Sequence, residues 1–438
     1  MPVRAFRPCG PTGFPALSLT PAGWWLSARI RRRLGGLQLF SRREYRKFHP
    51  GWLAARLPVG HYLHRGCYQD KPVAEPVFFA RILGRRRELV PPDTADAPAI
   101  QPPKAPIGVY ASSLGNVFMN ELADALAASL VAAGARVVRG DERCSIRNRP
   151  RACLFVAPHE FFALGRGPAW ARPGVLATAV TYGTEQVQTP WFWRALPFVL
   201  ASRGHLDISW HTAELLARVM PSRHLTPGLS PTPPDTAPDI LDHPLLAAAW
   251  WRGGARLDPE DDWAARPLDL VFFGGASPAR DAFFARNAAR LADYEAVIYL
   301  RRRGRGPVHA RAAEGDLCAV ARQACARSRL TLSVHRDAFG FFEWHRLVAQ
   351  AMAMGSVAVA EGSLPVPDFR AGEHYFSDDA GHLPGLVDWL LRDPDGVRAA
   401  LACRRAARKL LLARFSPAVA GRRILAFLDA LGVARAGC

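Results

Sequence analysis

The stretch LDLVFFGGASPARDAFFARNAARL, residues 268–291, decides the fold of this chain. Its first six residues, 268–273, are an apolar run of the kind that forms a buried strand. A glycine turn at residues 274–278 follows, and residues 279–291 have the apolar spacing of a helix. A strand, a tight turn and a helix in this order are the repeating unit of parallel α/β sheets.

The same alternation continues toward the C-terminus. Further strands are predicted at residues 296–300, 330–334 and 357–360, and helices at residues 342–354 and 383–391. We therefore expect a Rossmann-like domain over residues 267–415.

A second alternation precedes this one. Five apolar runs predict strands, at residues 107–111, 135–138, 152–157, 175–180 and 206–209. Residues 117–133 have a helical pattern, which Gly134 is suited to end because it has no Cβ. Residues 107–230 are therefore expected to form an N-terminal Rossmann-like domain. The predicted fold class is α/β, with two facing Rossmann-like domains and a ligand cleft at the carboxyl ends of their strands.

The remaining segments differ in composition from the two domains. We expect a poorly ordered tail at 1–37, a small helical accessory module at 38–90, a Pro-rich linker at 91–106, an interdomain connection at 231–266 and a C-terminal helix at 416–438. That last helix is amphipathic and is expected to cross back and pack on the first domain.

Composition narrows the function classes. The net charge of +19 comes from 53 arginines and 4 lysines against 38 acidic residues, an arginine excess typical of a GC-rich coding sequence. The arginines are spread along the chain and mixed with acids, which disfavours a nucleic-acid-binding stripe. None of the 8 cysteines forms a Cys-x-x-Cys pair, so reduced thiols and a cytoplasmic protein are the simplest interpretation. No uninterrupted apolar stretch is long enough to span a membrane, which leaves peripheral association at its inner face open.

A series of motifs in the C-terminal half is more specific. Val334-His335-Arg336 is followed by Glu343 and Arg346, by the small-residue run at 351–355 and by Ala360-Glu361. This order resembles the C-terminal domain of GT-B glycosyltransferases (the group 1-like glycosyl transferases), in particular the spore-maturation-protein-like branch. The resemblance covers residues 268–415 well and the preceding domain loosely.

The resemblance implies a metal-independent transferase, with no cofactor, that uses a nucleotide diphosphate sugar. A diphosphate needs backbone N–H groups at a helix N-terminus and fixed cations, and a carboxylate can hold ribose or sugar hydroxyls. The candidate donor-binding residues are Gly274, Gly275, Ser277, Arg280, His335, Arg336, Glu343, Arg346 and Glu361. Each also has a structural alternative: a tight turn for the glycines, solvent-facing arginines, and a His335 that serves only a backbone carbonyl.

One departure from the family pattern bears on stereochemistry. Many retaining GT-B enzymes carry two glutamates eight positions apart before the small-residue run. Here those positions hold Phe342 and Gln350, and Glu343 is displaced by one. Retention and inversion therefore both stay open.

Polar residues follow two strands of the first domain. His159 and Glu160 come after the run at 152–157, and Glu185 follows the run at 175–180. An inverting transferase needs a general base near the acceptor hydroxyl, for which His159 is the first candidate and Glu160 or Glu185 the next. A helix-capping glutamate and a structural histidine are the alternative. His-Glu lacks the second histidine of a zinc-protease helix, so no metal is expected.

Four further polar residues are candidates for the acceptor side or the cleft. They are Asn116, Asn120, Thr184 and Gln186. Asn116 is as well suited to cap the helix at 117–133 as to touch a substrate.

The N-terminal module has a resemblance of its own. Tyr45, the turn at 49–51, His61-Tyr62-Leu63 and Gly66 are similar to a short helical repeat found beside glycosyltransferase domains in bacterial polysaccharide proteins. Its aromatic stripe is expected to build a small core, and the module to serve docking.

The leading hypothesis is a glycosyltransferase that moves a sugar from a nucleotide diphosphate donor to a glycan, lipid-linked or natural-product acceptor in polysaccharide biosynthesis. The alternative is a non-catalytic glycan-binding or polysaccharide-assembly scaffold of the same fold. An arginine-rich RNA binder is a third hypothesis; no nucleic-acid partner is expected.

Overall fold

The computed structural model describes residues 21–69, 71–84, 101–229, 245, 263–302, 316–337, 340–341 and 348–433. These residues form two compact units. The first unit contains the described residues up to Pro227 together with those from Pro417 onward, and the second contains the described residues of Gly228–Ser416.

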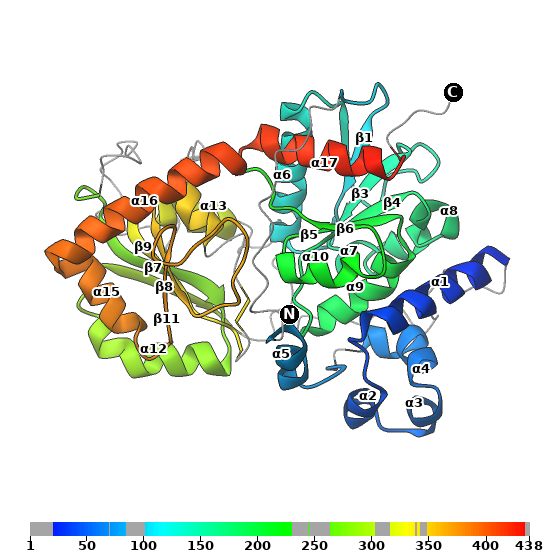
Figure 1. Ribbon diagram of the computed structural model, residues 1–438, viewed down its shortest axis with the longest axis horizontal. Helices are drawn as coiled ribbons and strands as arrows, with labels where there is room; N and C mark the ends of the chain where they lie inside the picture. Colours follow the sequence, from blue (N-terminus) through cyan, green and yellow to red (C-terminus); the bar gives the residue numbers. More distant parts are fainter. Residues whose placement is uncertain are drawn as a thin grey trace, which may run out of the picture. The chain divides into compact units, whose positions relative to one another are not determined.

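The first unit is built on a six-stranded parallel sheet with the order β2-β1-β3-β4-β5-β6 (Figure 1). Its strands are β1 (Ile107–Tyr110), β2 (Val137–Gly140), β3 (Ala152–Val156), β4 (Ala179–Gly183), β5 (Gly204–Asp207) and β6 (Ser222–His224). Every residue of β1, β3, β4 and β5 is buried, which explains why these strands read as continuous apolar runs.

Helices connect these strands. They are α6 (Val117–Ala132), α7 (Pro158–Phe161), α8 (Pro173–Leu176), α9 (Pro190–Ala201) and α10 (Trp210–Ala217), with the short turn η3 (Gly167–Trp170). The chain moves from β1 outward to β2 and then from β3 in the opposite direction. Because such crossovers are right-handed, α6 lies on one face of the sheet and α9 and α10 on the other.

The C-terminal helix α17 (Pro417–Ala430) belongs to the first unit, although the second unit precedes it in the chain. It packs against α6 (Figure 1). Its end also covers β5, since a Cβ on Gly204 would meet the side chains of Leu431 and Phe427. The expected return of this helix to the first domain is therefore confirmed.

The second unit contains a five-stranded parallel sheet with the order β11-β10-β9-β7-β8. Its strands are β7 (Leu268–Gly275), β8 (Ala296–Arg301), β9 (Ser328–Ser333), β10 (Val357–Glu361) and β11 (Phe376–Asp378). Its helices are α12 (Pro278–Leu291), α13 (Leu317–Ala326), α14 (Ala349–Ala353), α15 (Leu383–Arg392) and α16 (Pro394–Arg414). Leu270, Phe272 and Val359 from the sheet share one core with Phe283 of α12 and Val387 of α15.

The prediction of an α/β chain with two parallel-sheet domains is confirmed, and three local predictions need comment. The strand expected at 175–180 is wrong in its first half: residues Pro173–Leu176 form α8, and β4 begins at Ala179. Proline favours the first position of a helix, and a short apolar run does not separate a strand from a buried helical turn. Of the helix expected at 342–354, residues 342–347 lie outside the described residues.

The tail expected to be poorly ordered is helical in its described part. Residues Pro21–Leu37 form α1, and Leu26, Ile30, Leu34 and Leu37 of this helix are buried. These leucines and the isoleucine recur at helical spacing, and α1 packs against α8 and α9. The prediction for residues 1–37 is therefore wrong over 21–37, because tertiary packing supplies the stabilisation that the weak local pattern lacks.

The N-terminal module docks on α9. It contains α2 (Arg42–Phe48), α3 (Trp52–Arg56), α4 (Pro58–His64), the turn η2 (Gly66–Tyr68) and α5 (Pro76–Gly84). The Tyr62 hydroxyl donates to the Trp193 carbonyl at 2.6 Å. The Tyr62 and Trp193 rings also meet edge to face, with centroids 5.7 Å apart. The aromatic stripe thus forms a core that continues to Trp193 of α9.

Gly66 lets the residues of the repeat-like pattern meet. Tyr45 is fully buried and its hydroxyl lies 2.7 Å from His61 Nδ1. A Cβ at Gly66 would overlap that hydroxyl. Gly66→Ala is therefore expected to lower the free energy of unfolding by about 1–3 kcal/mol, as overpacking of a core does. Gly60→Ala is the control, because a Cβ there meets Leu57 at an ordinary 3.7 Å. Urea denaturation of the two variants checks this, and equal midpoints would contradict it.

Among the described helices, none is both long and apolar enough to cross a membrane. The described cysteines Cys67, Cys144, Cys153, Cys318, Cys325 and Cys403 are free thiols.

Candidate functional site

Both sheets change the direction of strand order at one point. In the first unit the change lies between β1 and β3, and in the second between β7 and β9. The loops that leave two such strands at their carboxyl ends diverge to opposite faces, so a crevice opens between them and ligands bind there. Each unit therefore has one candidate edge.

In the first unit, Glu160 lies at this point. The backbone N–H of Asn116, at the start of α6, donates to Glu160 Oε2 at 3.0 Å. Gly115 makes the approach possible, because a Cβ there would overlap the same carboxylate oxygen. On the other side, Ala157 adopts a left-handed conformation, with φ 49°, directly after β3. Such strained residues concentrate at functional sites, and this turn is what brings Glu160 back toward the start of α6.

Burial changes the protonation of this carboxyl group. Glu160 is 9% exposed. Removal from water raises its pKa to about 7, while the hydrogen bond from Asn116 N–H works in the opposite direction. Glu160 therefore exchanges a proton close to neutral pH, which suits a general acid or base.

His159 and Glu185 meet at the ends of β3 and β4. His159 Nε2 lies 3.5 Å from Glu185 Oε1. His159 is buried, and desolvation, helped by the charge of Arg194, lowers its pKa to about 3. Its Nδ1 has no hydrogen-bond partner among the described residues. His159 is therefore neutral at pH 7, and with so low a pKa it is a weaker proton acceptor than Glu160.

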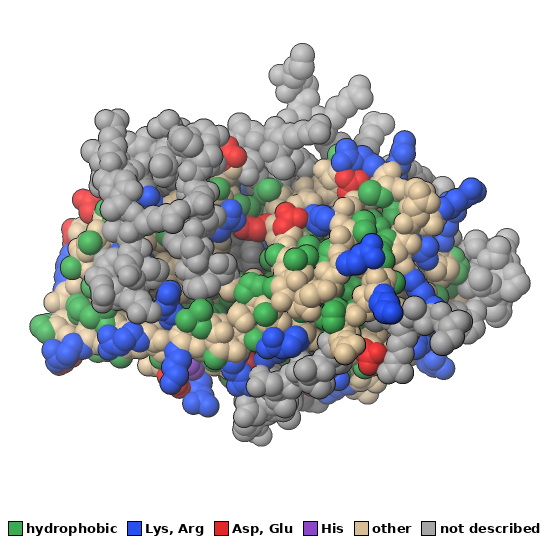
Figure 2. Space-filling view, turned by 90° about the horizontal axis from the view of Figure 1, so that it is seen from above, with side chains coloured by type: hydrophobic (Ala, Val, Ile, Leu, Met, Phe, Trp, Pro, Cys, Tyr) green, Lys and Arg blue, Asp and Glu red, His purple; other side chains and the backbone are tan. Residues whose placement is uncertain are grey.

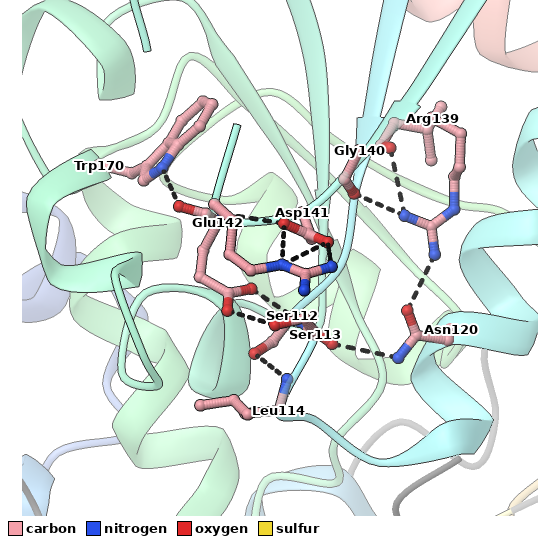
Figure 3. A network of polar contacts seen from close by, with 11 residues as sticks. Ser112, Ser113, Leu114, Asn120, Arg139, Gly140, Asp141, Glu142 and Trp170 are labelled. Atoms are coloured by element: carbon pink, nitrogen blue, oxygen red, sulfur yellow. Dashed lines mark hydrogen bonds and ion pairs between the residues drawn. The ribbon is translucent and has the colours of Figure 1, made fainter. Parts of the chain in front are cut away.

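The asparagines at the start of α6 hold the backbone. The Asn116 side chain caps α6 by accepting from the Phe118 N–H at 3.2 Å. Asn120 donates to the Ser112 carbonyl at 3.1 Å and accepts from Arg139 at 3.0 Å, as Figure 3 shows. The capping role considered for Asn116 is thus present, and Asn120 ties the β1 exit to β2.

The remaining cleft candidates follow β4. Gln186 Oε1 accepts from the Gln188 side chain at 2.7 Å. The Thr184 hydroxyl is buried and has no partner among the described residues. The Thr184 hydroxyl and His159 Nδ1 are thus two buried polar atoms without a hydrogen-bond partner among the described residues, one after β4 and one after β3.

Glu142 is a further buried carboxylate at this edge, which the sequence pattern did not predict. This carboxylate is 2% exposed and accepts from both the backbone N–H and the hydroxyl of Ser113, at 2.7 and 2.6 Å (Figure 3). Its carbonyl also accepts from Trp170 Nε1 at 3.0 Å. Glu142 therefore fixes, at Ser113, the same loop that Glu160 binds at Asn116, three residues further on. Its position just after a strand, in Asp141-Glu142, was the available signal.

Another missed group has the composition of a hydrolase triad. Thr181 Oγ1 lies 2.8 Å from His205 Nδ1, and His205 Nε2 lies 2.9 Å from Asp207 Oδ2. All three residues are no more than 1% exposed. Because no substrate can reach them, they join β4 to β5 and do not form a reaction centre.

In the second unit, the two glycines of the β7 exit have different surroundings. A Cβ on Gly274 would lie 2.7 Å from the Phe272 ring and 2.9 Å from Arg280 Nη1, whereas a Cβ on Gly275 meets no described atom within 4 Å. Gly274 is thus required by packing. Gly275 leaves open space at the end of the strand, beside the start of α12.

Arg280 braces the same point. Its Nε donates to the Val334 carbonyl at 2.8 Å and its Nη1 to the Gly275 carbonyl at 3.0 Å, so it joins the exits of β9 and β7. The side chain is buried over the Phe272 ring. Ser277 caps α12 by accepting from the Arg280 N–H at 3.2 Å. Arg280 therefore holds a buried positive charge behind the open space at Gly275.

The loop after β9 is held by β10. Glu361 Oε2 accepts from the His335 N–H at 2.8 Å, and His335 Nε2 lies 3.0 Å from the Gly362 carbonyl. The backbone-carbonyl role considered for His335 is thus present. Arg336, the next residue, is exposed. Glu343 and Arg346 lie outside the described residues.

Three potential metal ligands lie close together in the second unit. The ligand atoms of Asp378, Asp379 and His382 are within 4.8 Å of one another. The side chains of His382 and Asp378 are exposed, and they bond to each other at 3.3 Å. Exposed clusters of this kind are common without an ion, and we assign it no metal.

The chain is only weakly similar to proteins of known structure. No protein-family model matches the sequence, and no curated protein matches it. Similar solved structures include HepE of Anabaena in complex with UDP and glucose, with TM-score 0.46, 10% identity and coverage of 74% of this chain and 100% of that one. Sucrose-phosphate synthase from Thermosynechococcus elongatus has TM-score 0.43, 14% identity and coverage of 76% and 100%. A glycosyltransferase from Rickettsia africae has TM-score 0.39, 12% identity and coverage of 75% and 98%. Similarity at this level does not establish a mechanism.

Proposed function

We propose that this chain is a GT-B glycosyltransferase, which transfers a sugar from a nucleotide diphosphate donor to a hydroxyl of a glycan, lipid-linked or natural-product acceptor. The observation that carries the proposal is the open space over Gly275 beside the start of α12, with the buried Arg280 guanidinium behind it. This space lies at the point where the strand order of the second sheet reverses, between β7 and β9. Ligands of open parallel sheets bind at such points.

The donor diphosphate is proposed to lie over Gly275. The N-terminus of α12 favours an anion there, because aligned peptide dipoles leave partial positive charge at that end of a helix. Arg280 serves as a positioning residue that fixes the two strand exits and adds positive charge, and Arg336 is the exposed cation beside it. Glu361 orients the His335 loop. Arg346 and Glu343 keep their proposed roles toward the diphosphate and the donor hydroxyls. Neither a metal nor a cofactor is part of this proposal.

The acceptor hydroxyl is proposed to give its proton to Glu160. The pKa of about 7 makes this carboxyl group the better match to neutral pH, compared with about 3 for His159. Glu185 and His159, whose side chains meet at the ends of β3 and β4, are proposed to line the acceptor side.

The test is release of nucleoside diphosphate by the purified protein from a panel of nucleotide sugars. Gly275→Val is expected to weaken donor binding at least about tenfold, because its side chain enters the space proposed for the diphosphate. The fold should tolerate it, since a Cβ there meets no described atom. Gly385→Val is the matched control: Gly385 is equally open, but lies on the exposed face of α15.

Two outcomes would contradict the proposal. Equal donor affinity for both valine variants would mean that the donor diphosphate does not bind over Gly275. Glycan binding without any stabilisation by a nucleotide would favour the non-catalytic scaffold.

A further inference from the structure

The N-terminal module carries an apolar surface that its own core does not use. Of the large hydrophobic side chains among the described residues, Trp52 and Leu57 are the most exposed, at 69% and 60%. They lie at the two ends of the short helix α3. The core of the module is complete without them, since Tyr45, Tyr62 and Phe79 are each fully buried.

Two exposed arginines lie close to α3. The Arg56 guanidinium lies 6.0 Å from the centre of the Trp52 ring. Arg46 reaches across from α2 and donates to the Ala55 carbonyl at 2.6 Å. We refer to Arg46, Trp52, Arg56 and Leu57 as the α3 patch. All four side chains are exposed.

The charge of the module is strongly positive and poorly compensated at the patch. Residues 41–83 contain eight Lys and Arg against three Asp and Glu. Two of these acids, Glu44 and Glu75, lie 3.0 and 3.2 Å from Lys47. Lys47 therefore pairs with two of the three acids of the module. The side chains of Arg46 and Arg56 in the α3 patch are exposed to solvent.

We propose that the α3 patch docks this protein on the surface of an anionic lipid bilayer. Tryptophan favours the headgroup level of a membrane, and an exposed leucine beside it gains by entering the acyl boundary. Arg46 and Arg56 would meet lipid phosphates, to which guanidinium groups bind in a bidentate manner. A nucleic acid would satisfy the cations but leave Leu57 in water. The α3 patch combines cations with large exposed apolar side chains. Lys and Arg on the face shown in Figure 2 are scattered, with hydrophobic side chains among them.

The test is co-sedimentation of the full chain with sucrose-loaded vesicles, either of phosphatidylcholine alone or with about 30 mol% phosphatidylglycerol, a content at which surface charge attracts basic segments. We expect binding to the anionic vesicles only, weakened as salt rises. Trp52→Ala with Leu57→Ser should reduce it about tenfold or more, and Arg46→Glu with Arg56→Glu should abolish it. The matched control is Trp389→Ala with Leu412→Ser, which removes two exposed apolar side chains of the second unit.

Three results would overturn the proposal: equal binding to both kinds of vesicle, unchanged binding by the α3 patch variants, or self-association of the wild type that the same variants abolish. The last result would make the patch an interface between two copies. The inference does not depend on the proposed transferase activity, because donor hydrolysis is measured without vesicles and the two can fail independently.

Discussion

Replacing Glu160 by Gln is expected to lower kcat for sugar transfer by about 100- to 10,000-fold, the range that a positioned general base contributes. The amide has nearly the same shape and can still accept the hydrogen bond from Asn116 N–H, so the local structure should remain. KM for the donor should change little, because donor contacts are proposed in the second unit.

The pH dependence tests the same residue in a second way. With a pKa of about 7, Glu160 becomes competent as a base only as pH rises through neutrality, so wild-type kcat should rise there and the variant should lose this limb.

The stability of the protein should change with pH in the opposite direction. The folded protein keeps a proton that the unfolded chain gives up above about pH 4.5. The contribution of Glu160 to the free energy of unfolding is therefore fully present below about pH 4.5. It falls by up to about 3 kcal/mol as pH rises through about 7. Gln at this position should remove that loss.

Glu142→Gln is the control for this prediction. Glu142 is another buried carboxylate, and it accepts from a backbone N–H of the same β1–α6 loop. Its amide should destabilise the protein while keeping the pH limb of kcat. If Glu160→Gln retains kcat, or if both variants lose the limb together, Glu160 is not the proton acceptor.

Gly421→Val is expected to have the largest effect on stability. Gly421 lies where α17 meets α6, and a Cβ there would overlap the Ser129 carbonyl oxygen and lie 2.7 Å from the Ala133 Cβ. Backbone atoms cannot move aside as a flexible side chain can. The larger valine should therefore push α17 away from α6 and cost about 3 kcal/mol or more, at the upper end of what overpacking costs. Proteolysis near the C-terminus should become faster, because detached helices open locally.

Gly35→Val controls for the substitution itself. Gly35 is also helical, in α1 of the same unit, and a Cβ there meets no described atom within 4 Å. Calorimetry of the two variants should show a lower transition temperature for Gly421→Val alone. Equal transitions would mean that α17 does not pack against α6 as described.

Several features of the fold follow from local sequence. Strands such as β1 and β3 are buried on both faces, so they read as uninterrupted apolar runs, and Gly134 ends α6 with φ 85° as its lack of Cβ allows. The edge strands β6 and β11 were not predicted, because three residues are too few to show a period. Helix α1 was missed because its buried residues gain stability only by packing on the first unit.

The sequence by itself determined the α/β class, the two parallel-sheet units and the strand exits at which polar residues gather, because these depend on the short-range periods of apolar side chains. Only the tertiary structure decided the roles at those exits. The side chain of Arg280 is held by the carbonyl of Val334, that of Asn120 joins the Ser112 carbonyl to Arg139, and Glu160 is tuned by burial against the Asn116 N–H. Partners 44 to 54 positions away, as for Glu160 and Arg280, leave no local pattern. Desolvation, which sets the pKa of a carboxyl group, exists only once the chain has folded around it.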